Sequence, residues 1–329
     1  MTGSVLLLLA GLLLLAAGGE LLVRGAVRVA ERFGVSPLVI GLTLVGFGTS
    51  TPELAASLQA SLAGSPGIAV GNIVGSNIAN ILLILGVAAL IAPIAVTSRA
   101  LGRDGLVCMA ATLALPAAGL MGGLDRPTGI VFLAALVAYV ALALYQERQG
   151  SAEHGAVFDK AEAFKAAHPG SLEPPPAPSA GGLLLPLALA FSGLALVVLG
   201  GRLLVDGAVT LARALEIPEA VIGLTIVAVG TSMPEIVTSI IAALRRQPEI
   251  AFGNVIGSNI YNLLGIGGVT AVVAPTPVPA EIMARDAWVM IAASVLLLIV
   301  ARTWWRIGRR EGWVLLALYL GYLAWLWPR

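Results

Sequence analysis

The sequence has few charged residues for its length. Lys, Arg, Asp and Glu make up 11% of the 329 residues, whereas hydrophobic residues make up 58%. A soluble chain carries about 25% charged residues. The composition therefore excludes the soluble globular class and indicates a protein that crosses the lipid bilayer several times. Because the formal net charge is only +1, a nucleic acid or another polyanionic partner is not expected.

Cysteine and histidine, the usual ligands of transition metals, are almost absent. Cys108 is the single cysteine and lies in an apolar run, which excludes an intramolecular disulfide and a thiolate metal cluster. The two histidines, His154 and His168, lie outside the apolar segments. Neither a Walker-type phosphate loop nor a nucleophile paired with a base is recognisable. ATP drive, enzymatic activity and a bound cofactor are therefore not expected.

Long apolar segments are what the chain has in abundance. About 20 apolar residues cross the hydrocarbon core, and ten such segments can be placed, at 4–23, 36–62, 67–92, 104–121, 127–146, 182–205, 217–244, 249–274, 283–301 and 311–327. Between the fifth and sixth, residues 147–181 are charged and then proline-rich. Such a segment cannot bury a core and predicts a flexible linker with a short helix around 157–167. The interpretation is an all-α protein with a first five-helix repeat at 1–146 and a second at 182–329.

The distribution of Lys and Arg orients this bundle. With the N-terminus outside, the inner loops collect about 14 of these residues and the outer loops about 5, and cytoplasmic loops are the ones that favour positive charge. We therefore expect a multi-pass protein of the cell (plasma) membrane with both termini outside and the linker in the cytoplasm. Polar and aromatic residues at span ends are interpreted as interface anchors, at Arg103-Asp104, Arg285-Asp286, Tyr319 and Tyr322.

Residues 41–93 occur a second time at 223–275. At a constant offset of 182 positions and without a gap, 29 of 53 residues are identical. The string Gly48-Thr49-Ser50-Thr51-Pro52-Glu53 returns as Gly230-Thr231-Ser232-Met233-Pro234-Glu235. The string Gly-Asn-x-x-Gly-Ser-Asn-Ile-x-Asn begins at Gly71 and again at Gly253. Because each half holds five spans, an odd number, the second half must be inverted, as in secondary transporters that bind substrate near the midplane.

Each copy places one glutamate inside a segment otherwise apolar enough for a bilayer. A charged side chain at that depth costs about 3 kcal/mol or more and usually faces a polar cavity or a partner. The second, third, seventh and eighth spans contain no Lys or Arg near the same depth. Protonation or a bound cation therefore remains for Glu53 and Glu235. Two carboxylates that face each other would neutralise one divalent ion.

Further oxygen atoms lie near each glutamate at helical spacing. Thr49 and Glu53 are four residues apart, as are Ser76 and Asn80, so each pair shares a helix face. Pro52 cannot donate to the carbonyl of Gly48, so the helix should break there and release carbonyl groups. A site with oxygen ligands only favours Na⁺, Ca²⁺ or Mg²⁺ over Zn²⁺ or Cu²⁺. Close approach of the third and eighth helices is expected at Gly71, Gly75, Gly253 and Gly257.

These motifs closely resemble the two alpha repeats of the calcium/cation antiporter superfamily, specifically its sodium/calcium exchangers of prokaryotic type. The resemblance covers essentially the whole chain. It implies the sodium/calcium exchanger fold, with ten transmembrane helices as two inverted five-helix repeats. It also implies a secondary active antiporter that exchanges Na⁺ for Ca²⁺ by alternating access, with these two ions as its substrates.

The resemblance also implies a role for individual residues. Ca²⁺ would be ligated by Glu53 and Glu235 together with the carbonyls of Thr49 and Thr231. Flanking Na⁺ sites would use these residues with Ser50, Ser76, Ser232 and Ser258. Asn80 and Asn262 would complete the central set, and the carbonyls of Gly46 and Ala228 would add to sodium coordination.

Alternatives remain at this point. A buried glutamate can also carry a proton, so a proton/Ca²⁺ exchanger of the same fold is the main alternative, although hydroxyls beside both glutamates suit Na⁺. A cation channel would need a continuous pore, which two inverted halves around one site do not favour. Asn at both positions 80 and 262, where potassium-dependent relatives carry an acid, argues against K⁺ dependence. No protein partner is required, and we expect a monomer without a regulatory domain.

Overall fold

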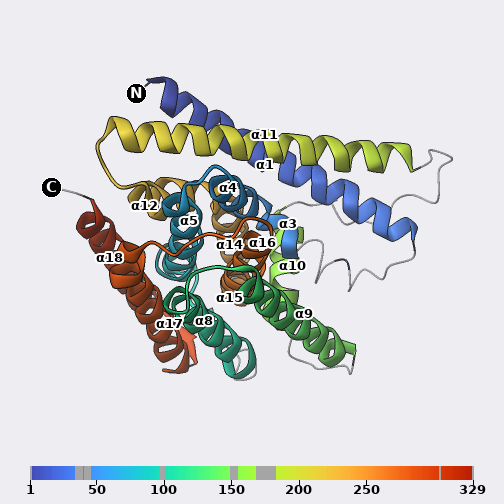
Figure 1. The fold of residues 1–329 in the computed structure, drawn as a ribbon. Coiled ribbons are helices and arrows are strands. Elements are labelled where there is room, and N and C mark those ends of the chain that lie inside the picture. Colours follow the sequence, from blue (N-terminus) through green and yellow to red (C-terminus); the bar gives the residue numbers. More distant parts are fainter. Residues whose placement is uncertain are drawn as a thin grey trace.

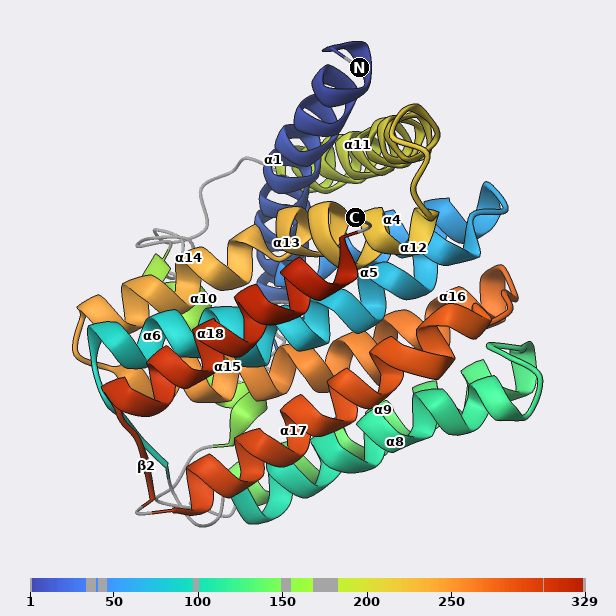
Figure 2. The ribbon, with the colours of Figure 1, turned by 90° about the vertical axis from the view of Figure 1, so that its left-hand side faces the viewer.

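A computed structural model describes residues 2–33, 40, 46–96, 101–148, 155–167, 183–303 and 305–327. These residues form a helical bundle with one short two-stranded sheet (Figure 1). Two long helices, α1 (Thr2–Arg32) and α11 (Leu184–Ala214), lie against each other across one side of the bundle. The other helices form the main body, and the 90° turn of Figure 2 shows several of them running side by side.

The elements of the first half surround the first copy of the repeated motif. After α1 they are α3 (Gly46–Thr49), α4 (Thr51–Leu62), α5 (Pro66–Ala79), the π-helical turn η2 (Asn80–Ile84), α6 (Leu85–Ile91), β1 (Ile94–Ala95), the π-helical turn η3 (Leu101–Gly105), α8 (Leu106–Leu120) and α9 (Arg126–Arg148). The segment between the halves contains α10 (Ala156–Ala167).

The second half repeats this order. After α11 its elements are α12 (Glu219–Ile222), η4 (Gly223–Val227), α13 (Ala228–Thr231), α14 (Met233–Leu244), α15 (Pro248–Ile260), η5 (Tyr261–Ile266), α16 (Gly267–Val273), η6 (Ile282–Asp286), α17 (Ala287–Arg302), β2 (Arg306–Ile307) and α18 (Arg309–Leu326). Strands β1 and β2 pair antiparallel, with Ile94 opposite Ile307. This small sheet joins the two halves.

Glycine residues let α1 and α11 approach each other closely. On the facing surfaces they recur every seventh residue, at Gly11, Gly18 and Gly25 and at Gly193, Gly200 and Gly207. A Cβ atom at Gly193 would lie 2.3 Å from the backbone nitrogen of Leu22, so a larger residue does not fit. The start of α1 packs on the end of α11, which makes them antiparallel (Figure 1). The equivalent helices of the two halves therefore run in opposite directions, as an inverted repeat requires.

Two helices of the repeated motif, one from each half, form the central pair of the bundle. In the most apolar stretch of Pro66–Ile91, 83% of the residues are buried, and in that of Pro248–Val273 the share is 89%. For α1 and α11 the share is only 28%. The outer helices thus present apolar side chains outward, as helices in lipid do, whereas the central pair is enclosed by protein on nearly all sides.

The helices match the predicted spans where the structure describes them. Seven described helices are long and apolar enough to cross a membrane, and an eighth is the bent pair Glu219–Thr231 and Met233–Leu244. The second predicted span, 36–62, includes residues outside the described ranges. The last, 311–327, corresponds to α18, whose first turn carries Arg309, Arg310 and Glu311.

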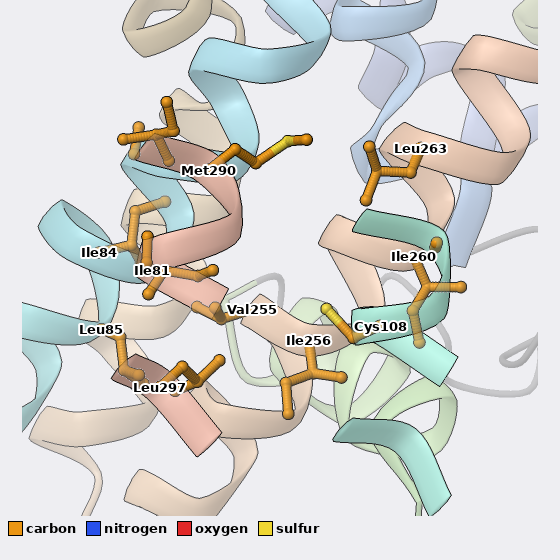
Figure 3. Close-up of a cluster of buried hydrophobic side chains, with 14 of the residues drawn as sticks. Ile81, Ile84, Leu85, Cys108, Val255, Ile256, Ile260, Leu263, Met290 and Leu297 are labelled. Atoms are coloured by element: carbon orange, nitrogen blue, oxygen red, sulfur yellow. The ribbon is translucent and has the colours of Figure 1, made fainter. Parts of the chain in front are cut away.

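One apolar core is shared by both halves. Figure 3 shows part of it, where side chains from η2, α6, α8, α15, η5 and α17 converge, among them Ile81, Ile84, Leu85, Cys108, Val255, Ile256, Ile260, Leu263, Met290 and Leu297. Cys108 is buried here with a free thiol, as a structural cysteine in an apolar environment.

The prediction that the segment 147–181 cannot bury a core is wrong for α10. This helix packs against α14, α15 and α3, and Ala156, Lys160 and Phe164 are all buried on it. The expected short helix around 157–167 is present, but it belongs to the packed body of the protein. The proline-rich part of the predicted linker lies outside the described residues.

The polar pairs interpreted as interface anchors have a buried aspartate and a half-buried arginine. Asp104 is 1% exposed and Asp286 is 0% exposed. Each accepts hydrogen bonds from the preceding arginine and from a tyrosine, with 3.1 Å from Tyr139 to Asp104 and 2.9 Å from Tyr322 to Asp286. Tyr322 is thus a hydrogen-bonded core residue, and Tyr319 is buried as well. In both halves these residues form a polar network inside the bundle.

Candidate cation site

The second and seventh spans are interrupted at equivalent serines. Helix α3 ends at Thr49 and α4 begins at Thr51, and helix α13 ends at Thr231 and α14 begins at Met233. Around Ser232 the helix axis bends by 48°. The prolines that follow lack the N–H group that would bond the carbonyls of Gly48 and Gly230. The predicted helix break is confirmed, and it places the first turns of α4 and α14 inside the protein.

Glu53 and Glu235 lie in these first turns, and both are 1% exposed. Neither carboxylate oxygen of Glu53, nor Oε2 of Glu235, has a hydrogen-bond partner among the described residues. Ser50, three residues before Glu53, donates to Oε1 of Glu235 at 3.3 Å, so the start of α4 lies close to the Glu235 carboxylate. Burying a carboxylate without a partner costs free energy. A bound cation or a proton would therefore stabilise this arrangement.

Equivalent asparagines hold the backbone at each glutamate. The Nδ2 group of Asn72 donates to the carbonyl of Glu53 at 3.1 Å and to Ser57 Oγ at 2.9 Å. In the second half, Nδ2 of Asn254 donates to the carbonyl of Glu235 at 3.4 Å and to Ser239 Oγ at 2.8 Å. These bonds tie α4 to α5 and α14 to α15. They fix the backbone of both glutamates relative to the central helices.

The predicted hydroxyl ligands are buried beside the glutamates. Ser50 Oγ lies 3.3 Å from Glu235 Oε1, and Ser258 Oγ lies 3.5 Å from the same atom. Ser76 Oγ donates to the carbonyl of Ala228 at 3.4 Å. The structure therefore brings side chains from the break before α4, from α5 and from α15 to the seventh span, at α13 and α14. Residues of both halves contribute to one site.

The remaining predicted residues are also buried. Thr49 and Ser232 have hydroxyl groups without a partner in the described part of the chain, whereas Thr231 donates to Asn72 Oδ1 at 3.0 Å. Asn80 donates to Asn259 Oδ1 at 2.9 Å, and its own Oδ1 is unpaired among the described residues.

Asn262 stands apart within this group because both its amide oxygen and its amide nitrogen lack partners among the described residues. It lies in η5, and Asn80 begins η2. Turns of this kind interrupt regular helices mostly at functional positions.

Lys160 is a residue of this site that sequence reasoning missed. Its side chain is 0% exposed, and Nζ donates to Ser258 Oγ at 2.5 Å, to Ser50 Oγ at 3.0 Å and to Glu235 Oε1 at 3.4 Å. The expectation that no basic partner exists holds for the four spans but not for the segment between the halves. A signal was present, because Ala156, Lys160 and Phe164 are spaced by four and share one helix face.

A cavity of ≈ 290 Å³ opens beside the site. It lies between α1, the start of α4 and the start of α14, and Glu20, Thr49 and Phe164 are among its lining residues. Because Thr49, one of the predicted ligands, lines this cavity, the cavity borders the candidate site. Phe164 of α10 forms part of its wall.

The repeated halves match a known family. A model of the sodium/calcium exchanger protein family matches residues 3–145 and again 185–327. The chain belongs to this family. It is 36% identical over 350 residues to sodium/calcium exchanger MaX1 of Methanosarcina acetivorans, which covers 98% of each chain. It is 37% identical over 322 residues to the putative antiporter CaxA of Alkalimonas amylolytica, which covers 97% of each.

The fold has also been solved. The sodium-calcium exchanger NCX_Mj, in crystals soaked with 100 mM Na⁺ and 10 mM Sr²⁺, matches with a TM-score of 0.62 at 36% identity over 98% of both chains. The chain therefore has the sodium/calcium exchanger fold, a multi-pass bundle of ten transmembrane helices in two inverted halves.

Proposed function

We propose that this protein is a secondary active antiporter that exchanges Na⁺ for Ca²⁺ by alternating access and extrudes Ca²⁺ electrogenically. The supporting observation is the pair of buried glutamates, Glu53 and Glu235, one from each half, at matching helix breaks. Three of their four oxygens have no hydrogen-bond partner among the described residues. Family membership and the exchanger relatives give this site its substrates.

The two ions would use overlapping sets of ligands. Ca²⁺ takes six to eight oxygen ligands, and the two carboxylates with the carbonyls of Thr49 and Thr231 supply its first ligands. Na⁺ uses the same groups together with neighbouring hydroxyls, so the two ions compete. The proposed ligand set is Thr49, Ser50, Glu53, Ser76, Asn80, Thr231, Ser232, Glu235, Ser258 and Asn262. The site needs no cofactor and no enzymatic step.

The charge of the ligand set bears on selectivity. Two carboxylates balance one Ca²⁺, and the remaining side chains of the set are neutral hydroxyls and amides. Asn80 and Asn262, both buried, supply no third acid. We infer that exchange is independent of K⁺. Na⁺ coupling is favoured over proton coupling because Ser50 and Ser258 place hydroxyl oxygens 3.3 and 3.5 Å from Glu235.

The same proposal includes the arrangement in the membrane. Residues 1–146 and 182–329 form the two inverted repeats, and 147–181 joins them on the cytoplasmic side. Both termini lie outside the cell (plasma) membrane, in keeping with the bias of Lys and Arg. One chain contains both glutamates, so a monomer is sufficient for transport.

Ca²⁺ uptake into proteoliposomes tests the function. An imposed Na⁺ gradient is expected to drive uptake that responds to membrane potential, while a pH gradient alone drives none. Glu53→Gln and Glu235→Gln should each abolish it. Glu249→Gln is the matched control, because Glu249 is an exposed acid on α15. Uptake that follows the pH gradient and ignores Na⁺, or wild-type uptake in either site variant, would contradict the proposal.

A further inference from the structure

Helix α10 brings a positive charge of the chain itself into the cation site. The three groups that accept hydrogen bonds from Lys160 Nζ are Ser50, Ser258 and Glu235, at 3.0, 2.5 and 3.4 Å. All three belong to the proposed ligand set, and they come from both halves of the protein. The ring of Tyr261 lies 5.4 Å from the same nitrogen. The ammonium group is therefore enclosed by the groups that would hold a transported ion.

An ammonium group can replace a hard metal ion at such a site. It carries one positive charge and three donors, and its partners here are a carboxylate oxygen and two hydroxyl oxygens. Each oxygen lone pair directed at Nζ is unavailable to Na⁺ or Ca²⁺. Glu53 keeps both oxygens free of hydrogen bonds within the described residues. The lysine thus occupies the Glu235 side of the site and leaves the Glu53 side open.

Contacts at both ends of α10 hold the helix in this position. At its start, the backbone N–H of Ala156 donates to Oδ2 of the buried Asp104 at 2.7 Å, where a carboxylate is favourable for a helix N-terminus. Near its end, Phe164 lines the cavity beside Thr49. Along its length it faces Gly253 and Gly257 of α15, where a Cβ atom at position 253 would lie 2.2 Å from the Asp159 side chain.

Among the described residues, equivalent glycine faces of α5 and α15 are covered by different segments. Gly71 and Gly75 of α5 are equivalent to Gly253 and Gly257, and they pack against the backbone of Ala220 and Leu224 in the seventh span. The corresponding face of α15 is covered by α10 instead. A segment from outside the two repeats therefore occupies one of two equivalent positions, and it carries the lysine.

We propose that Lys160 is a tethered competitor of the transported cations and that docked α10 is an autoinhibitory element of the exchanger. This rests on the proposed function, because Ser50, Ser258 and Glu235 must be cation ligands for Lys160 to compete with ions. Ca²⁺ or Na⁺ can fill the Glu235 side only when Lys160 leaves. The apparent affinity for Ca²⁺ is then the intrinsic affinity multiplied by the fraction of molecules in which α10 is undocked.

The size of the effect follows from that fraction. If α10 is undocked in about one molecule in ten, the apparent dissociation constant is raised about tenfold. Lys160→Met keeps the length and the apolar stem of the side chain and removes the charge. It is expected to lower the KM for Ca²⁺ and the dissociation constant for direct ⁴⁵Ca²⁺ binding by up to about tenfold, with a maximal rate that is not reduced.

A second variant tests docking while Lys160 is retained. Asp104→Asn weakens the contact with Ala156 and, like Lys160→Met, should lower the KM for Ca²⁺. Asp286→Asn is its matched control, because Asp286 has equivalent arginine and tyrosine partners in the other half and makes no hydrogen bond to α10 among the described residues. If Lys160→Met does not fold, the comparison of these two aspartate variants decides.

The outcomes separate the two proposals. Folded Lys160→Met with an unchanged or weaker Ca²⁺ affinity, or equal effects of the two aspartate variants, would overturn the competitor role and leave the exchange function intact. A chain that shows no Na⁺-driven Ca²⁺ uptake in wild-type or variant form, yet binds ⁴⁵Ca²⁺ more tightly in Lys160→Met, would contradict the exchange function alone. Thermal stability of each variant confirms that the comparison concerns folded protein.

Discussion

The two glutamates are equivalent in the repeat but should differ in their effect on stability. Glu235 pairs with Lys160 at 3.4 Å, whereas the carboxylate oxygens of Glu53 have no hydrogen-bond partner among the described residues. At an effective dielectric constant near 20, two unit charges at that distance attract by about 5 kcal/mol. Removal of one partner of a buried ion pair costs about 3–5 kcal/mol, because the other charge remains buried.

Glu235→Gln is therefore expected to lower the free energy of unfolding by about 3 kcal/mol or more. Glu53→Gln replaces an unpaired buried carboxylate with a neutral group and should be nearly neutral or stabilising. In the double variant Lys160→Met with Glu235→Gln, most of the loss should be recovered, because neither charge is left alone. The same cycle with Glu53 should give a much smaller coupling energy, since Lys160 makes no hydrogen bond to Glu53 in the described structure.

Denaturant titrations of purified protein in detergent measure these differences, in buffer free of Na⁺ and Ca²⁺ so that no transported ion stabilises the site. Variants are compared at a common denaturant slope, and coupling is taken from the double-mutant cycle. A Lys160–Glu235 coupling below about 1 kcal/mol would refute the ion pair, as would a larger coupling to Glu53. Exposed Glu249→Gln again serves as the control.

Two further predictions concern packing and positioning. Gly193→Ala should abolish transport and reduce the yield of folded protein, because its Cβ would lie 2.3 Å from the backbone nitrogen of Leu22. Gly321→Ala is the control, because nothing lies within 4 Å of the added atom. Equal transport rates of the two variants would contradict the close contact. Asn72→Ala should destabilise the protein by about 3 kcal/mol and impair transport, because the side-chain amide of Asn72 forms hydrogen bonds with Glu53, Ser57 and Thr231. Denaturation that matches the wild type would show that these hydrogen bonds contribute nothing.

The candidate site could be predicted from the sequence because its determinants are local and occur twice. The Gly, Ser and Pro residues around Glu53 dictate a helix break wherever the helix packs, and the second copy breaks at the equivalent Ser232. An acid in an apolar span must be enclosed, and both glutamates are. These expectations depend on backbone chemistry and on the cost of burying charge, neither of which needs tertiary information.

The role of Lys160 could not be predicted in the same way. Its segment is rich in charged residues, which is typical of a solvated linker, and only three-dimensional packing brings it beside Ser50 and Ser258. Asp104 and Asp286 were misjudged for a related reason. Their positions at span ends indicate an interface, but Tyr139 and Tyr322 supply hydrogen bonds that make burial of each carboxylate favourable.

The internal symmetry of the protein locates the difference between its two halves. Thr112 and Ser294, which are equivalent in the repeat, contact each other at 3.2 Å, so the pseudo-twofold axis passes between them. Away from that axis the two halves differ in matched interactions, and one such difference involves Asn72. Thr231 donates to Asn72 at 3.0 Å, but the equivalent atoms Thr49 Oγ1 and Asn254 Oδ1 have no partner in the described part of the chain.

This missing bond connects the site to alternating access. In a transporter built from inverted repeats, the two access states arise when the halves exchange conformations. In the proposed antiporter, the transport cycle would reverse the asymmetry between the Thr231–Asn72 and Thr49–Asn254 pairs. Because Lys160 is bound on the Glu235 side alone, docked α10 favours one of the two arrangements. Displacement of Lys160 by a cation would remove that bias.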